Sequence, residues 1–126
     1  MVFDGSHNPE GIAAAHDAIT KIYRGRVLIL TGVMRDKDFG GMIRTLAPIA
    51  AEVFCVRPDN PRALPADELA AAWQAGGVKA TDYPTATLAM QAALAQARVE
   101  KLPLFILGSL YLYREALDAF KETVSS

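Results

Sequence analysis

The fold is decided by a stretch near the beginning of the chain, Val2-Phe3-Asp4-Gly5-Ser6-His7-Asn8-Pro9-Glu10-Gly11. It begins apolar, as a strand does, then turns abruptly polar and continues beyond Pro9 into a long helical pattern. Proline suits the first turn of a helix because its missing N–H has no helical partner there, and Asn8 is a favourable N-cap. The stretch therefore predicts a strand, a sharp loop and a helix, in that order.

This loop is the first candidate site. It places Asp4, His7 and Asn8 at the carboxyl end of a strand and over a helix N-terminus. In open α/β sheets that crevice is where ligands bind, and a helix N-terminus favours an anion such as phosphate. The structural alternative is that Asp4 and Asn8 cap the helix and brace the turn, with His7 as a turn residue.

The same alternation continues to the end of the chain. Apolar runs at residues 26–31, 52–56, 78–83 and 104–107 predict four more strands, and solid runs are typical of strands covered on both faces. Helical patterns cover residues 9–24, 38–47, 65–75 and 84–99, and a last one carries Leu112, Leu117 and Phe120. We therefore predict an α/β fold with a doubly wound, mostly parallel sheet of five or six strands and helices on both faces.

Several residues set local expectations within these helices. Asp38 is expected to cap the second helix, Gly40 and Gly41 to weaken its first turn, and Pro48 to end or kink it near Ala47. The alanine-rich helix at residues 84–99 is expected to direct the following residues inward: Leu88, Ala92, Leu94 and Ala95.

Bulk composition excludes several classes of protein. The chain has 126 residues, a net charge of −1 and one cysteine, which indicates a single domain without an internal disulfide. The charge gives no footprint for nucleic acid or an anionic membrane. No apolar run reaches the roughly 20 residues that span a bilayer, and no signal peptide is evident, so we expect a cytoplasmic protein. Cys55, in an apolar run, is expected to be a buried and inert thiol.

The other polar segments that stand out in the sequence also follow predicted strands: Arg35 to Asp38, Arg57 to Arg62, and Ser109. Exit loops of parallel strands gather at one edge of the sheet, so we expect one ligand-binding rim. The chain lacks a P-loop, a G-x-G-x-x-G fingerprint, a His/Cys cluster with metal-ligand spacing, and a G-x-S-x-G elbow around Ser109. A polar rim without a complete catalytic set suggests half of a site.

Four segments resemble one known family in order and spacing: Asp4-Gly5-Ser6-His7-Asn8-Pro9, Gly32-Val33-Met34-Arg35-Asp36-Lys37-Asp38, Pro58-Asp59-Asn60-Pro61-Arg62-Ala63-Leu64 and Gly108-Ser109-Leu110-Tyr111-Leu112. They are similar to motifs in the Rossmann-like C-terminal domain of folylpolyglutamate synthase/dihydrofolate synthase, a branch of the Mur ligase superfamily. The resemblance covers nearly the whole chain. It implies a single C-terminal domain over residues 1–126. Because the chain opens inside a strand, we expect it to be part of a longer ligase.

The resemblance implies an ATP-dependent ligase that activates a folate or dihydropteroate carboxylate as an acyl phosphate, which the amino group of glutamate then attacks. The P-loop and most ligands of Mg²⁺ would lie in an N-terminal ATPase domain of the same parent chain, and the isolated C-terminal domain would be inactive. The resemblance also places ATP near Asp4, His7 and Asn8. It places the incoming glutamate near Lys37, Asp59, Arg62 and Ser109.

Structural explanations stay open for these residues. Lys37 between two aspartates could be a solvated charge run, Arg62 could anchor its proline-rich loop, and Ser109 could cap the last helix. At the level of function, the alternative is a free-standing α/β ligand-binding or interaction module without ligase activity. Another Mur ligase C-terminal domain would differ mainly in the amino acid added. Whether glutamate goes to dihydropteroate, to folates or to both does not follow from these residues.

Overall fold

A parallel sheet of five strands forms the centre of the molecule. The computed structural model describes residues 2–3, 16–17, 26–108 and 110–125. Its strands are β1 (Val2–Phe3), β2 (Val27–Gly32), β3 (Ala50–Cys55), β4 (Ala80–Asp82) and β5 (Leu104–Gly108). They lie in the order β1-β5-β2-β3-β4, and every neighbouring pair is parallel. The predicted sheet is therefore confirmed.

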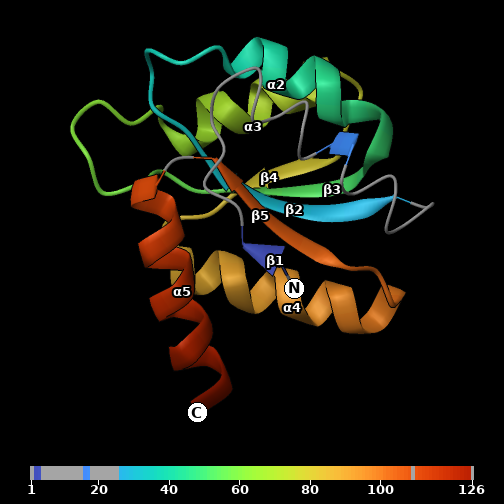
Figure 1. Ribbon diagram of the computed structural model, residues 1–126, viewed down its shortest axis with the longest axis vertical. Coiled ribbons are helices and arrows are strands. Elements are labelled where there is room, and N and C mark those ends of the chain that lie inside the picture. Colours follow the sequence, from blue (N-terminus) through green and yellow to red (C-terminus); the bar gives the residue numbers. More distant parts are fainter. Residues whose placement is uncertain (1, 4–15, 18–25, 109, 126) are drawn as a thin grey trace.

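Helices cover both faces of this sheet. Figure 1 shows α2 (Phe39–Leu46) and α3 (Ala66–Ala75) on one face and α4 (Ala86–Glu100) and α5 (Leu110–Ser125) on the other. The doubly wound arrangement is confirmed. The helix predicted at residues 9–24 lies mostly outside the described residues. Within that range the structure describes residues 16 and 17, and both are helical. No helix in the described part of the chain combines the length and apolarity that crossing a membrane requires.

Two hydrophobic clusters stabilise the two sides of the sheet. Ile29 of β2 packs in the cluster that contains Leu46 of α2 and Trp73 of α3. Its neighbour Leu28 packs in the other, with Met90 of α4. Successive side chains of a strand point to opposite faces, so a solidly apolar strand supplies both clusters. This is why the apolar runs predicted a doubly covered sheet.

The start and end of α2 follow the predicted signals. Asp38 is its N-cap, and the Asp38 Oδ1 atom accepts the Gly41 N–H at 2.9 Å. The helix ends at Leu46 and continues as a 3₁₀ turn, η1 (Ala47–Ile49), which contains Pro48. A Cβ at Gly41 would overlap the carboxylate of Asp38, so this glycine permits the cap rather than only weakening the turn.

Some expectations about the helices and strands were wrong in detail: β4 covers Ala80–Asp82 rather than residues 78–83, and α4 starts at Ala86 rather than at Pro84. Strand β3 begins at Ala50, two residues earlier than predicted, because Ala50 pairs with Val27 of β2. In α4 the buried residues are Ala89, Met90 and Ala93. Ala92 and Leu94 are half-buried and pack against the same cluster, as expected, whereas Leu88 is 46% exposed and Ala95 is also exposed. Apolar residues occur all around this helix, so the hydrophobic pattern does not define its inner face. Its inner face is instead the one whose Ala89, Met90 and Ala93 pack against the sheet.

Cys55 is fully buried at the end of β3, as predicted. Burial, together with the nearby Asp82 carboxylate, raises the pKa of its thiol to about 12. A thiol of such pKa is almost entirely protonated at neutral pH and therefore unreactive. We expect a disulfide reagent such as DTNB to label the native chain at pH 8 at least roughly 100-fold more slowly than the urea-unfolded chain. Comparable labelling rates would contradict this placement.

Candidate functional site

The described exit loops of the sheet meet at one edge, as predicted. The register aligns Thr31 of β2 with Cys55 of β3, and Cys55 with Asp82 of β4. Gly32 of β2 is likewise aligned with Gly108 of β5. The loops that follow, residues 33–38, 56–65 and 83–85, therefore leave the sheet on the same side. We refer to this edge as the rim.

Four of the predicted site residues cannot be located. Asp4, His7, Asn8 and Ser109 lie outside the described residues. The pairing of Phe3 with Ile106 does set the end of β1 beside β5. The predicted ATP contacts and the predicted role of Ser109 therefore stay predictions.

Backbone pairing joins the two largest rim loops. Met34 and Ala63 form an antiparallel bridge. On either side of it, the Arg35 N–H donates to the Arg62 carbonyl at 2.7 Å, and the Leu64 N–H donates to the Val33 carbonyl at 2.9 Å. Residues 33–35 and 62–64 thus form one ledge, although they are far apart in the sequence. The ledge fixes the two segments that carry Lys37 and Arg62 relative to each other.

The cationic side chains on this ledge are exposed. Arg62 Nη1 lies 4.0 Å from Asp36 Oδ2, and Arg35 Nη2 lies 3.4 Å from Glu68 Oε2. Lys37 forms no ion pair within the described part of the chain, and its backbone N–H donates to the Met34 carbonyl. Exposed ion pairs of this kind contribute about 1 kcal/mol or less. An anionic ligand could therefore replace Asp36 as the partner of Arg62 at little cost.

The turn before Arg62 is held by its own hydrogen bonds. Asn60 Oδ1 accepts the Arg62 N–H at 2.9 Å, and the Asn60 carbonyl accepts the Ala63 N–H at 3.0 Å. Asparagine side chains commonly close turns in this way. Pro58 and Pro61 restrict the backbone on either side of Asn60. The loop is thus stiff, and Arg62 projects from a fixed backbone.

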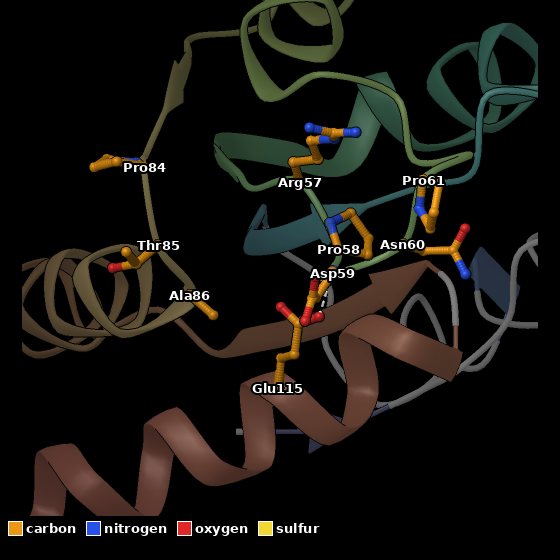
Figure 2. Close-up of a pocket in the computed structure, with 9 residues that line it drawn as sticks. All are labelled: Arg57, Pro58, Asp59, Asn60, Pro61, Pro84, Thr85, Ala86 and Glu115. Carbon is orange, nitrogen blue, oxygen red and sulfur yellow. Dashed lines mark hydrogen bonds between the residues drawn. The ribbon is translucent and has the colours of Figure 1, made fainter.

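Asp59 faces a different part of the rim. Its N–H donates to Glu115 Oε1 of α5, and both residues line a surface cavity of about 520 Å³. Figure 2 shows Thr85 and Ala86, at the start of α4, on another wall of this cavity. The structure therefore brings the Lys37 and Arg62 segments together but directs Asp59 toward α5.

A comparison with protein families decides what this architecture belongs to. The family model described as "Mur ligase, glutamate ligase domain" matches residues 1–109. The chain belongs to the Mur ligase family. The family resemblance seen in the four sequence motifs is thereby confirmed.

Relatives of this Mur ligase domain are longer proteins. It is 33% identical over 124 residues to a probable bifunctional folylpolyglutamate synthase/dihydropteroate synthase of Halobacterium salinarum, covering 98% of this chain and 15% of that protein. It is 32% identical over 115 residues to a folylpolyglutamate synthase of Lacticaseibacillus casei, covering 89% and 25%. The chain therefore spans a quarter or less of the length of these two relatives.

Solved structures share the fold of the Mur ligase domain. Escherichia coli FolC in complex with ADP, without folate substrate, has a TM-score of 0.84 at 22% identity, over 98% of this chain and 29% of that one. A Mycobacterium tuberculosis folylpolyglutamate synthase complexed with ADP and AMPPCP has a TM-score of 0.79 at 22% identity, over 93% and 28%. These likenesses confirm the α/β architecture.

Two rim residues of the Mur ligase domain were missed from the sequence. Thr85 is the N-cap of α4, and its Oγ1 accepts the Leu88 N–H at 3.1 Å. A threonine directly before a helical pattern, after Pro84, was a usable signal for it. Glu115 had no such signal. It lies within α5, and only the tertiary crossing of α5 with the loop at Asp59 gives it a role.

Glu115 also has a perturbed electrostatic environment. Burial raises the pKa of its carboxyl, and the nearby Asp59 carboxylate raises it further, while the hydrogen bond from the Asp59 backbone opposes the shift. The group is half-buried on the wall of the cavity. A carboxylate held in this position is costly to keep ionised, and a functional site is one place where such groups gather.

Proposed function

We propose that this chain is the C-terminal, glutamate-placing domain of an ATP-dependent ligase. The ligase would join L-glutamate to a folate or dihydropteroate carboxylate through an acyl phosphate. The observation that carries the proposal is the ledge, which holds the Lys37 and Arg62 segments side by side at the carboxyl edge of the sheet. The match to the Mur ligase glutamate ligase domain and the folylpolyglutamate synthases among the relatives support it.

The chemistry of the ledge suits this substrate. Glutamate carries two carboxylates, which need fixed cations so that its amino group faces the acyl phosphate. A guanidinium such as that of Arg62 can bind a carboxylate through two parallel hydrogen bonds, whereas Lys37 offers a compact point charge. Binding would exchange the exposed Asp36 carboxylate on Arg62 for a carboxylate of glutamate. Ser109 would complete this site from the end of β5.

ATP would be bound between this domain and an ATPase domain elsewhere in the parent chain. In this proposal Asp4, His7 and Asn8 contact ATP, and the P-loop lies in the other domain. The described residues hold no cluster of three or more His, Cys, Asp or Glu that could bind a metal ion. In this proposal the ligands for the Mg²⁺ of ATP come chiefly from the other domain. Closure of the two domains would keep water from the acyl phosphate.

The test is an assay of the full-length protein that contains this chain. Radiolabelled glutamate is supplied with ATP, Mg²⁺ and either dihydropteroate or a reduced folate, and amide product, ADP and phosphate are measured. We expect ATP-dependent incorporation of glutamate, with one ADP and one phosphate formed for each amide. No incorporation with either acceptor would refute the proposal, and the preferred acceptor distinguishes the two synthase activities.

A further inference from the structure

The hydrogen bond between Asp59 and Glu115 links the Arg62 loop directly to α5, and both residues line the cavity. Besides the buried Pro58, which lies beside Gly32, the loop at residues 57–62 is anchored at two points. At its end, the ledge holds Arg62 against residues 33–35. Near its beginning, the Asp59 N–H donates to Glu115 Oε1. Figure 2 shows these two residues next to each other on the cavity lining, with the hydrogen bond between them.

This second anchor lies three residues from Arg62. Between the two points the backbone is stiff, because Asn60 closes the turn and Pro58 and Pro61 restrict it. A displacement at Asp59 is therefore transmitted to Arg62 rather than absorbed between them. Pro58 is buried beside Gly32, whereas Asp59 itself is exposed and, with Glu115, lines the cavity.

Glu115 also connects two parts of the candidate site. It lies on α5, which begins at Leu110, two residues after β5 ends at Gly108. The loop that Glu115 holds carries Arg62. Ser109 directly precedes α5, the helix that carries Glu115. One carboxylate thus ties the β3 exit loop to the helix that follows β5.

The contact with Asp59 requires an oxygen that accepts the Asp59 N–H and does not require a negative charge. Because burial raises the pKa of the Glu115 carboxyl, the folded chain binds its proton more tightly than the unfolded chain does. The contribution of the group to stability is then greatest at acidic pH. It falls as pH rises from the pKa of the group in the unfolded chain through its raised pKa in the folded chain. A neutral glutamine would avoid the cost of ionisation while keeping an oxygen that accepts the Asp59 N–H.

We propose that Glu115 is a positioning residue that fixes the loop at residues 57–62 so that Arg62 is presented to the incoming glutamate. This inference rests on the function proposed above. Glu115 touches neither glutamate nor ATP in this account. It acts through the backbone of Asp59.

The experiment uses the full-length ligase with Glu115→Ala and Glu115→Gln variants. Asp118→Ala is the control, because Asp118 is an exposed carboxylate on the same helix. Hydrogen exchange of the peptide covering residues 57–63 reports whether the loop is held. Steady-state kinetics gives KM for glutamate, KM for ATP and kcat.

We expect Glu115→Ala to lose protection at the Asp59 amide and to raise KM for glutamate about tenfold, since a misplaced binding group weakens substrate positioning. KM for ATP and kcat should stay within about twofold of the wild type because the activation chemistry is untouched. Glu115→Gln should restore both the protection and KM, and Asp118→Ala should resemble the wild type.

Unchanged protection of the loop in Glu115→Ala would overturn the inference, whatever the kinetics. A KM for glutamate within twofold of the wild-type value would also overturn it. So would a general defect, in which kcat falls and the KM values for glutamate and for ATP both change. A wild-type ligase that adds no glutamate at all would instead refute the proposed function and, with it, the link from Glu115 to glutamate. The exchange data and the wild-type assay thus separate the two failures.

Discussion

Replacing Gly108 with alanine is expected to destabilise the chain by about 3–5 kcal/mol or to prevent folding, because the substitution causes both backbone strain and a steric overlap. Gly108 has a φ of +130°, which side chains other than glycine rarely adopt. A Cβ there would overlap the carbonyl oxygen of Gly32 on the neighbouring strand. Since that oxygen belongs to the backbone of the sheet, no rotamer change relieves the contact.

Gly77→Ala is the matched control for this prediction. Gly77 also has a positive φ, +86°, but a Cβ there would meet no atom within 4 Å. Its cost should be only the conformational penalty of about 1 kcal/mol. Urea unfolding followed by circular dichroism measures both variants. If Gly108→Ala proved no more destabilising than Gly77→Ala, the close approach of β2 and β5 at the rim would be wrong.

Arg62→Ala is expected to lower kcat/KM for glutamate about 100-fold in the full-length ligase, equivalent to about 2.7 kcal/mol of lost transition-state stabilisation. A charge-assisted, bidentate contact accounts for an effect of this size. Arg62→Lys should recover only part of the loss, because lysine keeps the charge but not the planar fork. The loss should be expressed mainly in KM for glutamate and little in KM for ATP.

Arg35→Ala is the control for Arg62→Ala. Arg35 lies on the same ledge, is similarly exposed and pairs with Glu68 of α3. It differs in having its partner on a helix rather than on the Lys37 loop. We expect a change of less than about threefold, since exposed ion pairs contribute little. Equal losses in the two variants would indicate a general effect of positive charge rather than a specific contact by Arg62.

The strands and their order of alternation with helices could be predicted from the sequence because the signals are local. The run from Val27 to Leu30 is apolar at every position, and its residues supply both core clusters in turn. Asp38 directly precedes α2, and Pro48 lies two residues after its last residue, so each end is marked by a nearby residue. Such signals need no knowledge of distant residues.

The details that escaped prediction depend on tertiary contacts. Alanines occur on all sides of α4, so its hydropathy pattern does not indicate which face lies against the sheet. Packing against the sheet determines that face. The bridge between Met34 and Ala63 joins two loops that local patterns describe only as irregular. Glu115 reads as an ordinary helical glutamate until α5 is placed beside Asp59. The rim was predictable as a location, whereas the pairing of its loops was not.

The central claim is that the rim of this domain places glutamate, while the carboxylate is activated chiefly by groups elsewhere in the ligase. The most direct test is the ratio of glutamate amide formed to ADP released by the full-length ligase carrying both Lys37→Ala and Arg62→Ala. The account predicts that acceptor-dependent ADP release continues, because acyl phosphate still forms and hydrolyses, while the ratio falls at least about tenfold below the wild-type value. A ratio equal to that of the wild type, whether the two rates fall together or stay unchanged, would contradict it.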